Sequence, residues 1–290
     1  MCCAALGLAM IGFIGSGVGS VRCALPRAAL ARRGLRVAMS AVEGVRPHEP
    51  RQQVATEPGG GEGEREDRRQ QSAAPKFKRP RQHVNPLASH HQRPLELPDD
   101  WDALTFSEPR PLHIDIGCAS GHFPLQLAEQ RPGTNVLGLE IRESLVERAN
   151  GWVSARSLSN LRYLACNANV DLPMILRASR SPLASVTIQF PDPWFKARHH
   201  KRRVVQAELV EHIAASLPVG GTFFVQSDVQ ELAESMREQI EITAGALLLA
   251  TPGPAGDGWI DHNPIGIATE REIATARKGG SVYRALYTRS

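Results

Sequence analysis

The chain has 290 residues, and its 34 Lys and Arg residues face 30 Asp and Glu residues, for a formal net charge of +4. Residues 1–42 hold five arginines and no acid, so the rest of the chain has 29 basic against 30 acidic residues. The hydrophobic content of 42% excludes a wholly disordered chain. Overall charge gives no argument for a nucleic-acid partner, which must rest on local clusters of basic residues.

The cysteines show no CxxC pair and no cysteine–histidine spacing typical of a metal site. Three of the five lie within the first 23 residues, and only Cys118 and Cys166 fall in the body of the chain. We therefore expect neither a disulfide scaffold nor a bound metal, and a reducing compartment is the better match.

The first 40 residues have the composition of a targeting leader. Residues 4–19 are apolar and glycine-rich, but this run is shorter than the roughly 20 apolar residues of a membrane-spanning helix. An arginine-rich, acid-free segment follows and ends near Ala38. This pattern predicts an organelle transit peptide over residues 1–40, for a plastid first and a mitochondrion second. The alternatives are translation that starts at Met39, which implies the cytosol, and a segment with neither meaning.

Two further segments precede the folded domain. Residues 41–75 are polar and repetitive, which predicts a disordered linker. Residues 76–98 contain KFKRPRQHVNPL, which is basic, broken by prolines and therefore irregular or extended. This stretch is either a solvated linker or an arm that closes over a site or touches nucleic acid. We expect the folded domain to cover residues 99–290.

From about residue 100, strand patterns alternate with helix patterns. Buried-strand patterns occur at 112–116, 135–140, 161–166, 184–190, 222–226, 246–250 and 282–288. Helix patterns occur at 122–130, 142–157, 203–216 and 229–243. This alternation predicts an α/β fold with a Rossmann-like, mostly parallel seven-stranded sheet, helices on both faces and an antiparallel last strand. Ligands of such sheets bind just beyond the carboxyl ends of the strands.

A glycine-rich turn follows the first predicted strand, in the order Asp115-Ile-Gly117-Cys-Ala-Ser-Gly121. Gly117 and Gly121 allow a tight turn and a close approach of the backbone to a ligand. The middle glycine of a GxGxxG dinucleotide fingerprint is replaced by Ala119. Asp115 would repel a pyrophosphate but would attract a cation, such as the ammonium and sulfonium of S-adenosylmethionine.

Polar residues also end the second and third predicted strands. Glu140 can accept hydrogen bonds from both hydroxyls of a ribose, which NAD and S-adenosylmethionine each contain. Asn167 offers a donor and an acceptor for an adenine edge. Either residue could instead be structural, Glu140 as a charge at a helix N-terminus and Asn167 as a turn residue.

The fourth predicted strand ends in the most informative stretch of the chain, FPDPWFKARHHKRR, which begins at Phe190. Two prolines hold Asp192 at the strand tip, and Trp194 and Phe195 can flank a flat base by stacking. Five cationic residues follow within eight positions, and we expect them to bind phosphates rather than form a plain solvated face. They are Lys196, Arg198, Lys201, Arg202 and Arg203. Asp228 ends the fifth predicted strand and belongs to the same edge.

Together these motifs resemble the tRNA (guanine-N7-)-methyltransferase family over roughly residues 80–290, and its cyanobacterial and plastid members most of all. The resemblance is carried by DIGCASG, LGLEIR, CNANV, FPDPWFKARHHKRR, QSD, and ATERE followed by VYRALY. It implies the class I S-adenosylmethionine-dependent methyltransferase fold. Three positions depart from the family pattern, since relatives often have Gly at 119, Asp at 167 and an aromatic residue at 271.

The resemblance implies the following site. Asp115, Glu140, Asn167 and Asp192, with Gly117 and Gly121, would bind S-adenosylmethionine. Lys196, Asp228, Thr269 and Glu272 would bind the substrate, a guanine at position 46 in the variable loop of tRNA. Asp192 would be the catalytic residue, and the remaining cations of the basic stretch would grip tRNA phosphates. Bacterial-type members act without an obligatory protein partner, so a monomer or homodimer with no membrane association is expected.

The sequence leaves three rival functions. A methyltransferase of the same fold could act on another RNA, a protein or a small molecule, although the basic stretch disfavours a small molecule. A dinucleotide-dependent oxidoreductase is disfavoured by the incomplete glycine fingerprint and by Asp115. A non-catalytic RNA-binding relative is disfavoured by the intact Glu140, Asp192 and Asp228. Fold alone does not choose among these functions.

Overall fold

The computed structural model describes residues 83–101 and 105–290. The expected leader and linker, residues 1–40 and 41–75, and the first part of the arm lie outside these residues. The strands are β1 (Leu112–Ile116), β2 (Asn135–Glu140), β3 (Leu161–Ala165), β4 (Leu183–Gln189), β5 (Thr222–Ser227), β6 (Leu248–Ala250) and β7 (Tyr283–Arg289). The helices are α2 (His122–Gln130), α3 (Glu143–Ala155), α4 (Ala168–Ala178), α5 (Ala207–Ser216), α6 (Gln230–Ala244) and α7 (Glu270–Arg277), with short 3-10 helices η2 (Ser89–His91) and η3 (Ala197–Arg202).

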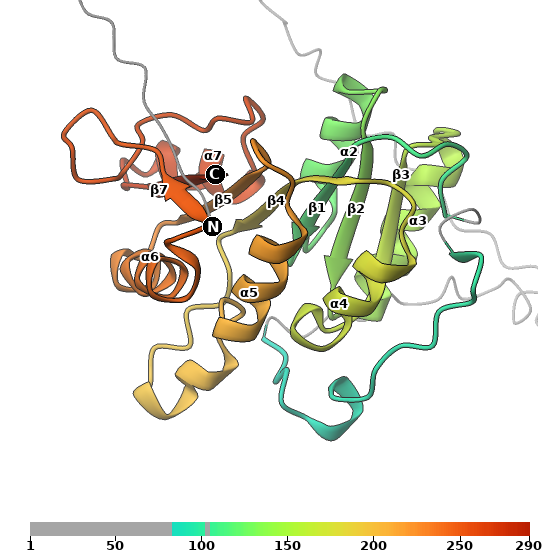
Figure 1. The fold of residues 1–290 in the computed structure, drawn as a ribbon, viewed down its shortest axis with the longest axis horizontal. Helices are drawn as coiled ribbons and strands as arrows, with labels where there is room; N and C mark the ends of the chain where they lie inside the picture. Colours follow the sequence, from blue (N-terminus) through green and yellow to red (C-terminus); the bar gives the residue numbers. More distant parts are fainter. Residues whose placement is uncertain (1–82, 102–104) are drawn as a thin grey trace, which may run out of the picture. The chain divides into compact units, whose positions relative to one another are not determined.

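The strands form one seven-stranded sheet in the order β3-β2-β1-β4-β5-β7-β6 (Figure 1). β1 to β5 pair in parallel, whereas β7 runs antiparallel to both β5 and β6. The expected mixed sheet with an antiparallel last strand is confirmed. The order reverses between β1 and β4, and this reversal is the switch point where a ligand site is expected.

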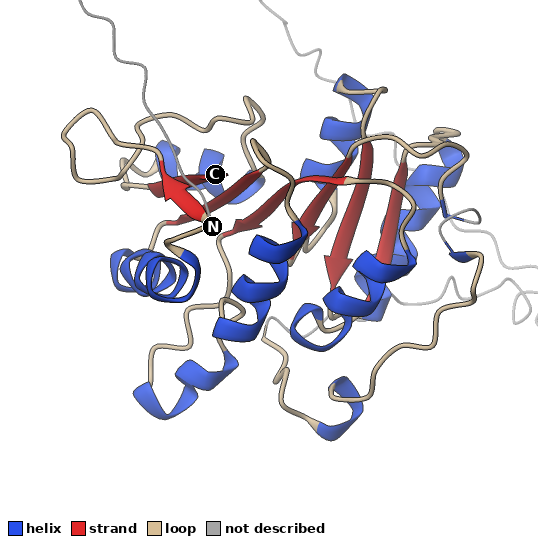
Figure 2. Cartoon of the chain, viewed as in Figure 1, coloured by secondary structure: helices blue, strands red, loops and turns tan. Residues whose placement is uncertain are grey.

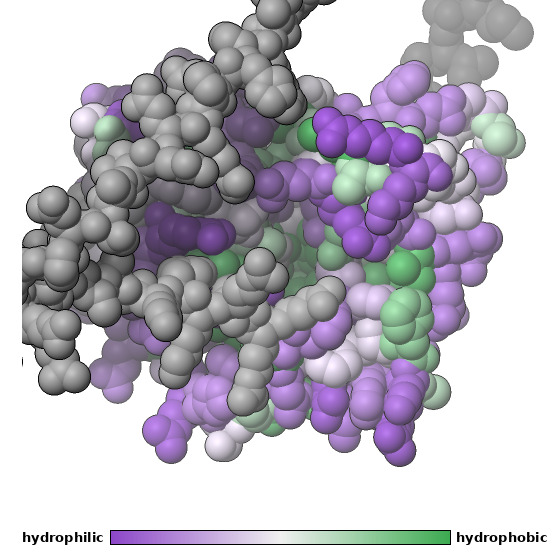
Figure 3. Space-filling model, turned by 180° about the vertical axis from the view of Figure 1, so that it is seen from behind, coloured by the Kyte–Doolittle hydropathy of each residue, from purple (hydrophilic) through white to green (hydrophobic). Residues whose placement is uncertain are grey.

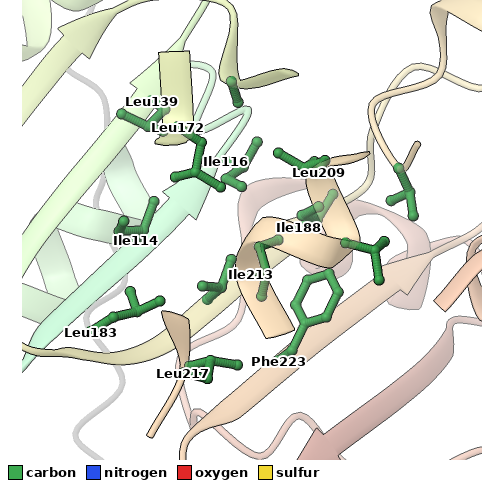
Figure 4. Close-up of a cluster of buried hydrophobic side chains, with 14 of the residues drawn as sticks. Ile114, Ile116, Leu139, Leu172, Leu183, Ile188, Leu209, Ile213, Leu217 and Phe223 are labelled. Carbon is green, nitrogen blue, oxygen red and sulfur yellow. The ribbon is translucent and has the colours of Figure 1, made fainter. Parts of the chain in front are cut away.

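Helices cover both faces of the sheet, as Figure 2 shows with helices in blue and strands in red. One hydrophobic cluster joins the sheet to α4, α5 and α6, and a second joins it to α2 and α3. Figure 4 shows the first cluster, in which Leu172 of α4 and Leu209 and Ile213 of α5 lie over Ile114 and Ile188. Because both faces are covered, every residue of β1 and β2 is buried.

Three elements differ from the sequence-based expectation. α4 was not expected, because Pro173 lies inside it and removes one backbone donor, although Asn167 caps its start by accepting from the Asn169 N–H. The helix expected at 203–216 begins only at Ala207, since the basic residues before it form η3. α7 was not among the helices predicted from the sequence.

The surface seen in Figure 3 is mainly hydrophilic, with apolar side chains in small patches among the described residues. Exposed large apolar side chains include Phe195, Val219 and Ile242. Across residues 83–101 and 105–290, none of the helices has the length and apolar character needed to cross a membrane. The largest core side chains, among them Phe223 and Tyr287, are fully buried.

Candidate active site

A cavity of about 550 Å³ lies at the carboxyl edge of the parallel strands. This volume is within the range of small-molecule sites. Residues from the ends of β1 to β5, the start of α7 and the arm line it together. Of the residues expected from the sequence, the cavity is lined by Asp115, Gly117, Glu140, Asn167, Asp192, Arg202, Asp228 and Thr269. Gly121, Lys196, Arg198, Lys201, Arg203 and Glu272 lie outside this lining.

The turn after β1 requires the left-handed backbone conformation that its glycines permit. Gly117 has φ 79° and Gly121 has φ 83°, and Ala119 between them is forced to φ 50°. Gly121 precedes α2, and a Cβ there would approach the ring of Tyr163 to 2.8 Å. Gly121 therefore acts on the site by letting the turn pack closely, and Gly117 lines the cavity itself.

Asp115 lies at the bottom of the cavity, with 3% of its surface exposed. Its Oδ1 accepts hydrogen bonds from the Thr187 hydroxyl at 2.6 Å and from Gln189 Nε2 at 3.3 Å. Burial raises the pKa of Asp115 to about 6, although both hydrogen bonds oppose that rise. A cationic ligand would compensate the buried carboxylate, which fits the ammonium expected from the sequence.

Glu140 is held in place by its neighbours at the end of β2. Its Oε2 accepts from the Ala119 N–H at 2.9 Å, which ties it to the turn after β1. Its Oε1 accepts from the backbone N–H and from Nε of Arg142, at 3.0 and 2.8 Å. The carboxylate is fixed at the cavity wall, and a diol would share it with the Arg142 guanidinium.

Asn167 connects the cavity to the arm. Its Nδ2 donates to the carbonyl oxygens of Pro86 and His91, at 3.2 and 3.0 Å. Both amide hydrogens are thereby used, while Oδ1 accepts one bond among the described residues, from the Asn169 N–H. Asn167 can still accept from an adenine amino group, but its donors hold the arm, of which His83 and Pro86 line the cavity.

Asp192 projects from a strained loop after β4. Phe190 and Trp194, on either side of it, have φ of 49° and 45°, an unfavourable conformation for aromatic residues. The Asp192 side chain is 42% exposed, and its Oδ1 lies 3.0 Å from Nδ1 of His83. Strain of this kind gathers at functional sites, and here it fixes a carboxylate at the cavity mouth.

The basic stretch divides into exposed and buried members. Lys196, Arg198 and Lys201 are exposed, whereas the Arg202 guanidinium lies 5.0 Å from the Trp194 ring centroid. Arg203 is buried, and it donates to the carbonyl of Pro193 and to Glu231. Arg203 therefore holds the Asp192 loop against α6 in place of the phosphate contact expected from the sequence.

Trp194 is covered by Arg202 and by two histidines, so the exposed Phe195 is the aromatic residue open to a base.

The first turn of α7 closes the cavity from the C-terminal side. Thr269 caps this helix by accepting from the Glu272 N–H. Asp228 is paired with Arg271 at 2.6 Å and also accepts from Thr275. Glu272 points into the protein, where Arg284, Asn263 and Gln226 donate to it. The structure thus brings Thr269 and Asp228 to the cavity but not Glu272, whose carboxylate is used to hold α7.

One connection across the cavity was missed in the sequence. Glu270 accepts from the Ser120 hydroxyl at 2.9 Å and lies 2.8 Å from Nδ1 of His122. The His122 ring stacks on Trp152 with an interplanar angle of 10°. Glu270 therefore joins the turn after β1 to α7, although 150 residues separate Ser120 from Glu270. The only available signal was the T-x-x-E pattern of Thr269 and Glu272, which is typical of a helix start.

Comparison with known proteins decides the family. Residues 109–285 match a family model described as "Putative methyltransferase". The tRNA (guanine-N(7)-)-methyltransferase of Nostoc sp. (strain PCC 7120) is 50% identical over 220 residues, which cover 76% of this chain and 97% of the relative. The enzyme of the same name from Synechocystis sp. (strain PCC 6803) is 46% identical over 211 residues, covering 72% of this chain and 97% of the relative.

The chain belongs to the tRNA (guanine-N(7)-)-methyltransferase family. Its sheet order and flanking helices are those of the class I S-adenosylmethionine-dependent methyltransferase fold, so the family resemblance and the fold expected from it are both confirmed. Among solved structures, the aminoglycoside resistance methyltransferase NpmB1 aligns with a TM-score of 0.47 and 22% identity, covering 68% of this chain and 95% of its own. The matches cover nearly the full length of both relatives. The family model matches within the folded domain of this chain.

Proposed function

We propose that this methyltransferase transfers a methyl group from S-adenosylmethionine to N7 of guanine 46 in the variable loop of tRNA. The observation that carries the proposal is one cavity lined by chemically different carboxylates. Asp115 and Glu140 are buried and held in place. Asp192 is partly exposed and precedes an exposed basic stretch. The family's relatives carry this activity in their names.

The buried part of the lining suits the cofactor. Asp115 offers a buried carboxylate to the ammonium, Glu140 offers oxygens to the ribose hydroxyls, and Gly117 lets the backbone approach. Asn167 offers Oδ1 to the adenine amino group, while its Nδ2 holds the arm. These residue types fit a molecule with cationic and hydroxyl groups, and they do not fit a pyrophosphate.

The more exposed part of the lining suits guanine. Guanine N7 carries an in-plane lone pair and needs no deprotonation, and S-adenosylmethionine supplies an already activated methyl group. The residues therefore have to position the base in line and to favour the positive charge that it gains. We assign Asp192 and Asp228 to the N1–H and N2 amine of guanine, with Thr269 at the wall and Asp228 exchanging Arg271 for the base. Phe195 offers a stacking face.

We assign the phosphate contacts to the exposed cations Lys196, Arg198 and Lys201 and to Arg202 at the cavity mouth. A class I methyltransferase that acts on another RNA or on a protein is the second candidate, and a non-catalytic RNA-binding relative is the third.

We place the enzyme in the plastid, with the leader over residues 1–40 and residues 41–75 as a linker. The alternative is a cytosolic protein whose translation starts at Met39. We further propose that the enzyme acts as a monomer or homodimer without an obligatory protein partner.

Methyl incorporation distinguishes these candidates. The enzyme is incubated with methyl-labelled S-adenosylmethionine and, separately, with unmodified tRNA, ribosomal RNA and a protein extract. Label in tRNA alone supports the proposal. Label in ribosomal RNA or protein would replace the substrate, and binding of S-adenosylmethionine without transfer to any of the three would favour the non-catalytic reading.

A further inference from the structure

A row of polar side chains, buried except for the partly buried Ser185, links β1 and β4 and includes Asp115 of the cavity lining. In the register of these strands His113 lies opposite Ser185, and Asp115 lies opposite Thr187. Alternate residues of a strand share a face, so these four side chains lie together on one side of the sheet. His113 is 1% exposed and Thr187 is fully buried. Neither His113 nor Thr187 has a role in the mechanism above.

The row is continuous in hydrogen bonds. Nδ1 of His113 lies 2.7 Å from the Ser185 hydroxyl, and Nε2 lies 3.2 Å from the Thr187 hydroxyl. Thr187 in turn lies 2.6 Å from Oδ1 of Asp115. Each buried polar group in the row therefore has a partner, as buried groups require.

The direction of every bond in the row follows from Asp115. An ionised carboxylate only accepts, so Thr187 must spend its single hydroxyl proton on Asp115. Thr187 can then only accept from His113, which places the imidazole proton on Nε2. Burial lowers the pKa of His113 to about 3, so the ring carries one proton. Nδ1 is therefore bare and accepts from the hydroxyl of Ser185.

The surroundings keep this arrangement in place. Phe123 of α2 packs against the imidazole with ring centroids 6.0 Å apart. The charged groups that act on the row are Arg131, which lowers the pKa of His113 further, and Glu140, which raises that of Asp115. Both Thr187 and Gln189 donate to the same oxygen of Asp115, Oδ1. The second oxygen is thereby left to the ligand.

We propose that His113 is a positioning residue for cofactor binding: its Nε2–H donates to the Thr187 oxygen and so holds that hydroxyl in the orientation that reaches Asp115, which orients the carboxylate toward the cofactor ammonium. This inference rests on the proposed function, in which Asp115 binds S-adenosylmethionine. The imidazole acts through Thr187 and touches no ligand. A histidine inside a strand two positions before the glycine-rich turn thus gains a role that packing alone does not require.

Equilibrium binding of S-adenosylmethionine to the full chain tests the inference. His113→Phe keeps a ring against Phe123 but removes both nitrogens, and we expect its Kd to rise about three- to tenfold, as for the loss of one buried hydrogen bond. Thr187→Val keeps the shape but removes the donor, and we expect a rise of about tenfold or more. The double variant should bind no more weakly than Thr187→Val, since His113 acts only through that hydroxyl.

The pH dependence of binding separates positioning from general stability. The carboxylate of Asp115 is protonated more readily when the Thr187 hydroxyl is removed or is no longer held in place by His113, so the pH at which binding is half lost should rise in both variants. Thr222→Val on β5 makes the same chemical change without a link to Asp115, and it should move neither Kd nor this midpoint. An unchanged Kd and midpoint in His113→Phe, or effects that simply add in the double variant, would overturn the inference.

Nitrogen-15 NMR of the histidines tests the tautomer in the unmodified protein, even if a variant fails to fold. The signal of His113 should show protonated Nε2, bare Nδ1 and no titration between about pH 5 and 8. A proton on Nδ1, or a ring that becomes charged in that range, would sink the inference. Asp115→Asn separates a failure of this inference from a failure of the proposed function. Normal binding of S-adenosylmethionine by this variant would contradict the proposed cofactor site itself.

Discussion

At the scale of single residues, the site is a set of carboxylates in different environments. Asp115 and Glu140 are buried and held by several donors, whereas Asp192 is partly exposed beside His83. These environments suit different tasks, since a buried carboxylate binds a buried cation and an accessible one can meet a substrate base. The residue types were readable from the sequence because each ends a strand, but their hydrogen-bond partners were not.

Asp192→Ala should lower the turnover rate by about 100-fold or more, because it removes a carboxylate that stabilises the positive charge on the methylated base. Binding of tRNA should remain within about twofold, since phosphate contacts supply most of the affinity. Single-turnover rates and filter binding measure the two effects. Asp192→Asn serves as the matched control, and near-normal turnover of Asp192→Ala would show that this carboxylate is not required.

Binding of S-adenosylmethionine should weaken below about pH 6, where Asp115 takes up a proton. The cation competes with that proton, so Kd should rise by up to about tenfold per pH unit below this value. Titration calorimetry at several pH values measures it. Asp115→Asn should bind weakly and lose this dependence, and a wild-type Kd that is flat from pH 5 to 7 would contradict the assignment.

The same pKa predicts a stability effect of opposite sign. The pKa of Asp115 is raised on folding from 3.8 to about 6, so the folded state holds the proton more tightly than the unfolded state. The free energy of unfolding therefore falls as pH rises from about 4 to 6, and ionised Asp115 destabilises the protein at pH 7. In the absence of cofactor, Asp115→Asn should raise Tm at pH 7 and not at pH 3.5. A lower Tm at pH 7 would contradict this sign.

At the scale of elements, α7 and η3 bring distant parts of the chain to the cavity. The first turn of α7 contacts the turn after β1 through Glu270 and the end of β5 through Arg271. η3 carries exposed cations beside the Asp192 loop. Neither helix was expected from hydrophobic periodicity, because α7 is short and polar and η3 is basic throughout. Such elements are set by capping and ion pairs, which a periodicity argument does not detect.

Glu270→Ala should raise the KM for tRNA by up to about fivefold, the range of a partly exposed ion pair. The reason is that α7 loses its ties to Ser120 and His122, so the wall of the base site is less well placed. Steady-state kinetics measures the effect. Glu234→Ala, which changes an exposed glutamate on α6, is the control. Equal KM values for the two variants would show that Glu270 does not help to place the base site.

Arg198→Ala combined with Lys201→Ala should weaken tRNA binding and flatten its salt dependence. Two lost phosphate contacts reduce the slope of log K against log salt by about 1.4 to 1.8. Arg177→Ala with Arg180→Ala, at the C-terminal end of α4, is the matched control and should leave the slope unchanged. If the first pair also left the slope unchanged, the basic stretch would not be the tRNA contact.

At the scale of the whole molecule, the sheet and the position of the site at its carboxyl edge were predictable from the sequence. The contacts by which α7, the Asp192 loop and the arm enclose the cavity were not. β1 and β2 are short, largely apolar stretches that are followed by Gly117 or end at Glu140, so the strand ends could be read directly. Glu272 and Arg203 were expected to face a ligand, yet they bind Gln226 and Glu231. Asn167 lines the cavity as expected, but its amide hydrogens bind Pro86 and His91 of the arm. Those contacts depend on tertiary packing, which a single sequence does not reveal.

The central claim is that guanine N7 in tRNA is the methylated atom. Protein starting near Ser40 is incubated with unmodified tRNA and methyl-labelled S-adenosylmethionine, and the tRNA is then cleaved chemically at N7-methylguanosine. We predict a single cleavage at the variable-loop guanine, which is absent with Asp192→Ala. Incorporated label without cleavage at that guanine would contradict the claim, because the methyl group would then lie on another atom or another nucleotide.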